Sequence, residues 1–291
     1  MSINWFPGHM VTARKEAIET MRRTDVVIEV LDARVPYSSC NPDFETFRRE
    51  NRRPALKILN KADVADRERT QKWLAYYNAM PNVRAIALSA KKRGEVNRIL
   101  TECQTLAPTR LSGEKPLRMM ILGIPNVGKS TLMNSLLGRR VAKVGDEPAI
   151  TKMQMRHEIG AHMSLVDTPG MLWPKVAADV ALKLAATHSI GRNAYEDDSV
   201  AIELADYLLE DYLELITARY GTLPTAVGGG GHALLVAIAQ RRSFVARGGQ
   251  PDVQKAASVL LHEFRTGVLG PITLETVEQV ATRVSARIIN M

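Results

Sequence analysis

The stretch that most constrains the fold is residues 117–137, where an apolar strand leads through a glycine-bounded turn into a helix. Within it, Gly123–Ser130 fits the phosphate-binding loop pattern GxxxxGK[ST]. The glycines let backbone N–H groups converge on phosphates, and the helix N-terminus adds positive potential. We predict that Lys129 reaches the β- and γ-phosphates and that the Ser130 hydroxyl binds Mg²⁺. The nucleotide contacts expected from this loop and helix are Asn126, Val127, Gly128, Lys129, Ser130 and Thr131.

A second phosphate motif lies downstream. Asp167–Gly170 follows the apolar run 163–166 and has the DxxG form. Behind a phosphate-binding loop, Asp167 is expected to hold Mg²⁺ through water, and the Gly170 N–H to sense the γ-phosphate. The two motifs together predict a nucleoside triphosphatase.

A base-reading motif precedes both of them. Asn60–Asp63 has the NKxD form and follows the predicted strand 54–59. A carboxylate accepts two hydrogen bonds side by side, and guanine offers such a pair where adenine does not. Asp63 therefore predicts selectivity for GTP over ATP, with Lys61 lying along the base and Asn60 joining the loops.

A further loop supports this prediction. Ser89, Ala90 and Lys91 follow the predicted strand 85–88 and match the loop that supports the guanine carbonyl through a backbone N–H. Ordinary GTPases place the two base-reading motifs last, and here they come first, so the motif order is circularly permuted. The γ-phosphate-sensing motif then leads directly into the C-terminal helices, and we hypothesise that hydrolysis repositions them.

The chain as a whole is predicted to be α/β. The predicted strands span residues 25–31, 54–59, 85–88, 117–122 and 163–166. Strands that alternate with helices predict a mostly parallel sheet with helices on both faces. We expect a circularly permuted P-loop GTPase domain over residues 1–175, followed by a small all-helical domain over 176–291.

Outside these strands, helical patterns dominate. Residues 12–23 predict a basic helix near the start. Ser199 and Asp252 are placed to cap two later helices, the first ending at Gly221, with Gly228–Gly231 as a flexible break between them. The inward-facing residues expected for these two helices are Leu204, Leu208, Tyr212, Leu215, Ala256, Val259, Leu260 and Phe264.

Composition narrows the setting. The chain has 291 residues and two cysteines without a metal or redox spacing, which favours a reducing compartment. No signal peptide and no apolar run of about 20 residues is present, so we expect a cytoplasmic protein without membrane contact. The net charge is +8, and residues 91–192 hold 16 Lys and Arg against 8 Asp and Glu. This surplus favours polyanionic partners, although a bound nucleotide or a solvated surface accounts for part of it.

Five motifs together resemble one family. They are Asn4–Met10, Asp32–Pro36, Asn60–Asp63, Gly123–Ser130 and Asp167–Lys175. In them the chain resembles the ribosome biogenesis GTPase A family of circularly permuted, hydrophobic-substituted GTPases, and the C-terminal half matches more loosely. The resemblance implies GTP-driven late assembly of the large ribosomal subunit, with hydrolysis stimulated by the particle. It also implies binding of GTP and GDP, rRNA contacts from the helical domain, and a monomer off the ribosome.

The same resemblance assigns catalytic roles. Thr151 aligns with the switch threonine that binds Mg²⁺ when GTP is present, although Ala149 replaces the usual glycine before it. Met171 stands where Ras-like enzymes carry the glutamine that orients water. By resemblance, His9 orients that water instead, beside the catalytic Lys129 and Thr151. The alternative for His9 is a role in packing or in RNA contact.

Asn126 has two possible roles. Its position is the one that coordinates K⁺ in similar potassium-stimulated GTPases, where a monovalent cation offsets developing charge. K⁺ is therefore expected to stimulate hydrolysis, beside the Mg²⁺ requirement. Alternatively, Asn126 bonds its own loop backbone.

Three functions are compatible with these motifs. One is an assembly enzyme that hydrolyses GTP on the immature large subunit. The others are a regulatory switch with a protein partner and an RNA-binding scaffold that hardly turns over GTP. The basic stretch and the N-terminal motif favour the first.

Overall fold

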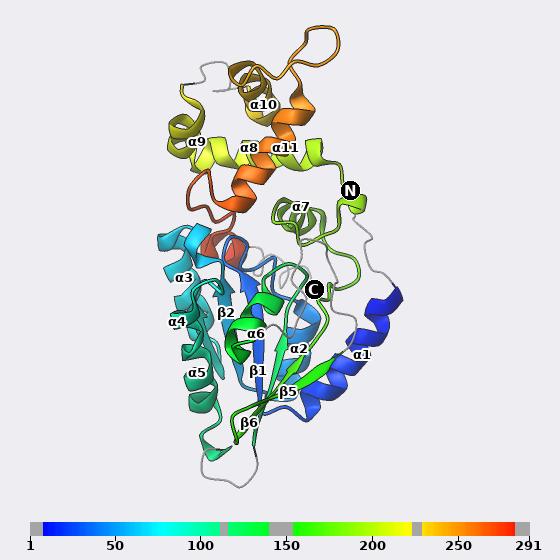
Figure 1. Ribbon diagram of the computed structural model, residues 1–291, viewed down its shortest axis with the longest axis vertical. Helices are drawn as coiled ribbons and strands as arrows, with labels where there is room; N and C mark the ends of the chain where they lie inside the picture. The colour runs from blue at the N-terminus through cyan, green and yellow to red at the C-terminus, as the bar shows by residue number, and fades with distance from the viewer. Residues whose placement is uncertain (1–7, 111–115, 140–153, 223–228, 283–291) are drawn as a thin grey trace.

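The computed structural model describes residues 8–110, 116–139, 154–222 and 229–282 (Figure 1). Within these ranges the strands form one six-stranded sheet with the order β3-β2-β1-β4-β6-β5. Its parallel strands are β1 (Val26–Asp32), β2 (Ala55–Asn60), β3 (Val83–Ala87), β4 (Leu117–Leu122) and β6 (Met163–Asp167). The sheet is thus mostly parallel, as predicted.

One strand was not predicted. β5 (Met155–Ile159) pairs antiparallel with β6 at the edge of the sheet. Its side chains are exposed or half-buried, and they include Arg156 and Glu158. An edge strand without a buried apolar face lacks the hydrophobic pattern that identifies the others.

Helices cover both faces of the sheet. Alternate side chains of β1 accordingly point into different hydrophobic cores. Val26, Ile28 and Val30 face the main core, while Val27 faces α1 and α2. The helices packed around the sheet are α1 (Gly8–Arg22), α2 (Pro42–Glu50), α3 (Arg67–Asn78), α4 (Arg93–Val96), α5 (Arg98–Leu106) and α6 (Lys129–Leu137). Short 3-10 turns lie at η1 (Ala62–Val64), η2 (Pro108–Arg110) and η3 (Arg192–Ala194).

The later helices form a separate layer. α8 (Asp197–Asp211), α9 (Leu213–Tyr220), α10 (Gly230–Arg241) and α11 (Val253–Thr266) gather beyond one end of the sheet, with α7 (Ala178–Ala186) between the two parts (Figure 1). None of the helices in the described ranges has both the length and the apolar character that crossing a bilayer requires.

The prediction of one helix from Ser199 to Gly221 is wrong, because the structure has two helices there. α8 already begins at Asp197, and the chain leaves helical geometry at Tyr212 before α9 begins. The Tyr212 hydroxyl exchanges hydrogen bonds with the backbone of Thr273 and also contacts Asp66. We attribute the break to these tertiary contacts, which helical periodicity alone does not reveal.

The glycine run has a packing reason. Gly231 lies in α10, where an added Cβ would come within 2.1 Å of the Ile202 carbonyl oxygen on α8. The Gly231 N–H donates to Asp206, which also lies on α8, at 2.5 Å. Glycine at this position therefore permits close contact between α10 and α8. The start of the glycine run, at residue 228, lies outside the described part of the chain.

Candidate functional site

The phosphate-binding loop lies between β4 and α6, as its sequence predicted. Gly128 has φ +98° at the N-cap of α6, and Asn126 also has a positive φ. Lys129 is buried, and its Nζ donates to the carbonyls of Gly123 at 2.9 Å and Ile124 at 2.8 Å. The ammonium thus lies inside the curve of its own loop. Burial lowers the pKa of Lys129 to about 8, despite the opposing attraction of Asp167.

The DxxG segment lies against this loop. A Cβ added at Gly170 would come within 3.0 Å of Pro125 Cα and 3.1 Å of Lys129 Nζ. Met171 N–H donates to the Gly123 carbonyl at 3.4 Å. A side chain at this position would crowd the phosphate-binding loop, so glycine allows the DxxG segment to lie close beside the predicted phosphate position.

The residues proposed for Mg²⁺ suit that ion chemically. Ser130 lies in the first turn of α6, and Asp167 ends β6. Burial raises the pKa of Asp167, and Lys129 only partly offsets the cost of its charge. Hydroxyl and carboxylate oxygens are hard ligands of the kind Mg²⁺ takes, and a divalent cation would compensate the buried carboxylate. Bound there, Mg²⁺ would offset the negative charge of the phosphates.

Asn60 joins the base-reading and phosphate-binding loops. Its amide nitrogen donates to the Val127 carbonyl at 2.7 Å, and its oxygen accepts from the Ala90 N–H at 2.9 Å. An added Cβ at Gly128 would come within 2.2 Å of that amide nitrogen. The three loops predicted to bind nucleotide are therefore held together by one buried side chain.

Lys61 and Asp63 differ in what they contact. The Lys61 Nζ donates to Asp32 at 2.8 Å and to the Asn126 carbonyl at 2.7 Å, so its ammonium is occupied and its alkyl chain remains to lie along a base. Asp63 is exposed on η1. Within the described chain, no group hydrogen-bonds its carboxylate. It is therefore able to accept a ligand.

The third loop is held from both sides. Ser89 N–H donates to Glu95 at 2.9 Å, and the Ala90 carbonyl accepts from Ser135 of α6 at 2.9 Å. Ser89 and Ala90 are buried, while Lys91 is exposed. The two hydrogen bonds and the burial of Ser89 and Ala90 fix the loop backbone at the edge of the predicted base site.

Asn126 makes a contact that neither of its two expected roles includes. Its side-chain amide donates 2.8 Å to the backbone carbonyl of His188, beyond the end of α7. The contact joins the phosphate-binding loop to the C-terminal helical part. The K⁺ role of Asn126 stays a prediction.

Three predicted residues are not placed at the site by the described side chains. Thr151 and its neighbour Ala149 lie outside the described residues. His9 lies in the first turn of α1, but its side chain is outside the described ones. Met171 is 1% exposed and belongs to the same buried apolar cluster as Ala17 and Met21 of α1, so its side chain is part of the core.

Sequence reasoning assigned no site role to Asp32 and Arg34. Both are buried, and Asp32 accepts from the Nζ of Lys61. The sequence signal for them is the Asp32–Pro36 motif, which carries the family resemblance. A charged pair in a loop does not by itself show which partners it contacts.

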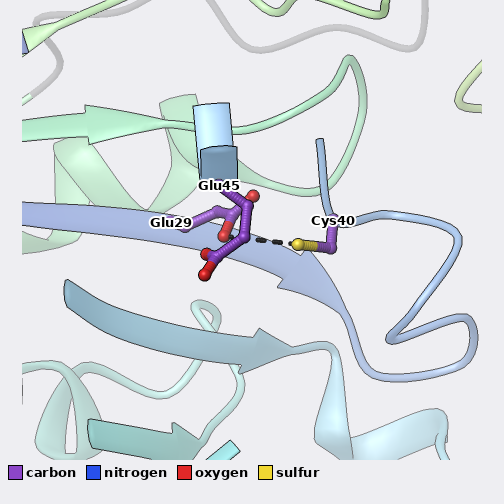
Figure 2. A group of neighbouring side chains, drawn as sticks. All are labelled: Glu29, Cys40 and Glu45. Atoms are coloured by element: carbon purple, nitrogen blue, oxygen red, sulfur yellow. Dashed lines mark hydrogen bonds between the residues drawn. The ribbon is translucent and has the colours of Figure 1, made fainter. Parts of the chain in front are cut away.

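A second cluster of potential metal ligands lies away from this site. Glu29, Cys40 and Glu45 come close enough together to share an ion (Figure 2). The Nζ of Lys57 already lies 2.5 Å from Glu29, 3.0 Å from Glu45 and 3.4 Å from the Cys40 sulfur. Although burial opposes it, the two carboxylates raise the pKa of Lys57, which stays charged. The lysine therefore supplies the cation, and burial keeps the pKa of the Cys40 thiol above its usual range.

The fold and these loops define a class of protein: a circularly permuted P-loop GTPase. Residues 118–211 match the family described as 50S ribosome-binding GTPase. A Bacillus cereus protein named ribosome biogenesis GTPase A is 37% identical, over 98% of this chain and 97% of its own length. The chain belongs to the ribosome biogenesis GTPase A family and is a GTPase.

Other relatives extend the similarity. The Bos taurus protein named mitochondrial ribosome-associated GTPase 1 is 30% identical over 93% of this chain and 88% of its own length. A GDP-bound structure of TM YlqF has a TM-score of 0.61 at 25% identity, covering 89% of this chain and 98% of that one. A crystal structure of GNP-bound YlqF from T. maritima gives 0.60 at the same identity, covering 91% and 98%. The similarity thus includes both the sheet and the helical part.

Proposed function

We propose that this GTPase acts in late assembly of the large ribosomal subunit and that the immature particle stimulates its hydrolysis of GTP. The observation that carries the proposal is the similarity to ribosome biogenesis GTPase A across 98% of the chain, because it includes the helical part as well as the nucleotide motifs. The match to a family described as 50S ribosome-binding supports the choice of the large subunit.

The proposed nucleotide chemistry follows the geometry of the loops. Asp63 accepts the paired N–H groups of guanine, and Lys61 lies along the base. Lys129 leaves its loop carbonyls for the phosphates, while Ser130 and Asp167 hold Mg²⁺, joined by Thr151 when GTP is present. Gly170 reports the γ-phosphate. Asn126 supplies an oxygen to K⁺, and His9 orients the attacking water.

The proposed rRNA contact involves the tip between α10 and α11. Arg241 and Arg247 are exposed there, and the turn between them also exposes Val245. Arg242 is less available, because it pairs with Glu263 at 3.1 Å and lies over the Tyr220 ring. Exposed arginines that neutralise phosphates make binding salt-dependent. The turn protrudes from the helical layer in Figure 1, where an RNA surface can reach it.

The direct test measures GTP hydrolysis in K⁺ and in Na⁺ buffer, with purified large subunits, with small subunits, or with neither. We expect slow basal turnover that rises with large subunits alone and needs K⁺ for its full rate. The Lys129→Ala variant should lose hydrolysis under every condition. If large subunits neither bind nor change the rate, the ribosomal assignment is withdrawn while the GTPase assignment stands.

Two variants test the finer roles within the same assay. Arg247→Glu should weaken binding to the particle and reduce stimulation, leaving basal hydrolysis unchanged. His9→Ala should lose stimulated turnover while still binding GDP. Full stimulation of His9→Ala would show that another group orients the water.

A further inference from the structure

Arg34 contacts both parts of the molecule with one side chain. It lies just after β1 and is 1% exposed. Its Nε and Nη2 donate to the two carboxylate oxygens of Asp32 at 2.9 and 2.8 Å. Its Nη1 donates to the last carbonyls of α11, at 3.2 Å to Arg265 and 3.5 Å to Phe264. The guanidinium therefore joins a carboxylate of the sheet to the C-terminus of a helix in the other layer.

The second partner of Asp32 is the lysine of the base-reading loop. Asp32 is fully buried and accepts from Lys61 Nζ at 2.8 Å, while the same Nζ donates to the Asn126 carbonyl. One buried carboxylate thus faces two cations. The α11 carbonyls, at the negative end of the helix dipole, stabilise the remaining positive charge. The position of Lys61 is therefore connected through Asp32 and Arg34 to α11.

The backbone of the base-reading loop is held by the segment that follows α11. The Ile272 N–H donates to the Val64 carbonyl at 3.1 Å, and the Thr273 hydroxyl accepts from the Asp66 N–H at 3.1 Å. Gly267 has φ +79°, and an added Cβ would come within 2.4 Å of the Val64 side chain. Val64 is the residue after Asp63, so the chain leaving α11 packs directly behind the guanine-reading carboxylate.

We propose that Arg34 is a positioning residue that couples guanine-nucleotide binding to docking of the C-terminal end of α11 on the base-reading loop. The proposal rests on the proposed function in taking Lys61 and Asp63 as the base site. A nucleotide that orders this loop stabilises the docked helix, and by thermodynamic reciprocity the docked helix strengthens nucleotide binding. Couplings of this kind are commonly about tenfold in affinity.

The test combines GDP affinity with amide hydrogen exchange. In the wild-type protein, GDP should slow exchange over residues 262–273. The Arg34→Met variant, which keeps an unbranched apolar stem and loses both contacts, should bind fluorescent GDP about tenfold more weakly. It should also lose the GDP-dependent protection of that segment. Arg34→Lys can hold Asp32 but cannot reach the carbonyls at the same time, so it should recover stability while protection stays reduced.

A matched control is Arg48→Met. Arg48 is also buried and pairs with a carboxylate, Glu45, at 2.7 Å, and none of its hydrogen bonds reaches the helical layer. It should leave GDP affinity unchanged. If Arg34→Met does not fold, Thr273→Val carries the same test, because it removes the hydroxyl bonds to Asp66 and to the Ala33 carbonyl.

The outcomes distinguish failure of the coupling from failure of the base-site assignment. Wild-type GDP affinity in a folded Arg34→Met, or no GDP effect on residues 262–273 in the wild type, would overturn the coupling alone. If guanine selectivity survives Asp63→Ala, the base-site assignment fails, and the coupling fails with it.

Discussion

Lys129 and Asp167 are buried, oppositely charged groups at the predicted phosphate site. Each has its charged form disfavoured by burial, and each offsets that cost for the other only in part. Lys129 also donates to two carbonyls of its own loop. A polyphosphate with Mg²⁺ would supply the missing charge of both signs. The site residues are therefore arranged for a charged ligand.

Lys129 gives nucleotide binding a predicted pH dependence. With burial lowering its pKa to about 8, the ammonium loses its proton at mildly alkaline pH in the free protein. Bound phosphates favour the charged form and raise that pKa, so binding above pH 8 takes up a proton. GDP affinity should thus be flat below about pH 8 and fall above it, by at most about tenfold per unit. Titration with fluorescent GDP in excess Mg²⁺ from about pH 7 to 9 measures this, and constant affinity across the range would contradict it.

At the scale of elements, apolar patterning predicted most of the sheet. The five predicted strands agree with β1, β2, β3, β4 and β6 to within about two residues, because each is buried and apolar. Asp252 caps α11 as expected, accepting from the Lys255 N–H. The sequence did not predict β5, which depends on pairing at the edge of the sheet. It also did not predict the break between α8 and α9 at Tyr212, which depends on contacts with residues distant in sequence. In the site, motif spacing located the loops, whereas the Asn126–His188 and Arg34–α11 contacts required the fold.

The segment after α11 makes a testable contribution to stability. Glu275 is buried and accepts from the backbone N–H groups of Tyr37 at 2.7 Å and Ser38 at 3.1 Å, from the Ser38 hydroxyl, and from Lys183 at 3.4 Å. Glu275→Ala leaves these donors without their acceptor and should lower the free energy of unfolding by about 3 kcal/mol in urea titrations. Glu278→Ala, at an exposed position, should change it by less than about 0.5 kcal/mol. Equal effects of the two substitutions would show that Glu275 does not hold this segment.

At the scale of the whole molecule, the two parts meet on the base side of the site. Residues 272–275 and the end of α11 hold the loops after β1 and β2. The γ-phosphate-sensing segment enters the helical part on another path, through Met171 and α7. We expect hydrolysis to move α7, whose Lys183 pairs with Glu275 at 3.4 Å, while the backbone contacts of Ile272 and Asp66 on the base side persist.

This division predicts a pattern in hydrogen exchange. GTP and GDP share the base and differ in the γ-phosphate, so exchange over residues 262–275 should be the same in both states. Exchange over residues 170–186 should differ between a non-hydrolysable GTP analogue and GDP. The reverse pattern would place the switch on the base side and contradict the proposed division.

The central claim is that a base-reading loop ahead of the phosphate-binding loop selects guanine through Asp63. The most direct measurement compares the affinities of Asp63→Asn and wild type for GDP and xanthosine diphosphate. An amide offers one donor and one acceptor, which suits the C2 carbonyl of xanthine but leaves the guanine amine unpaired. We predict that GDP affinity falls by about 2 kcal/mol or more while xanthosine diphosphate becomes the preferred ligand. Unchanged preference for GDP in a folded Asp63→Asn would contradict the account.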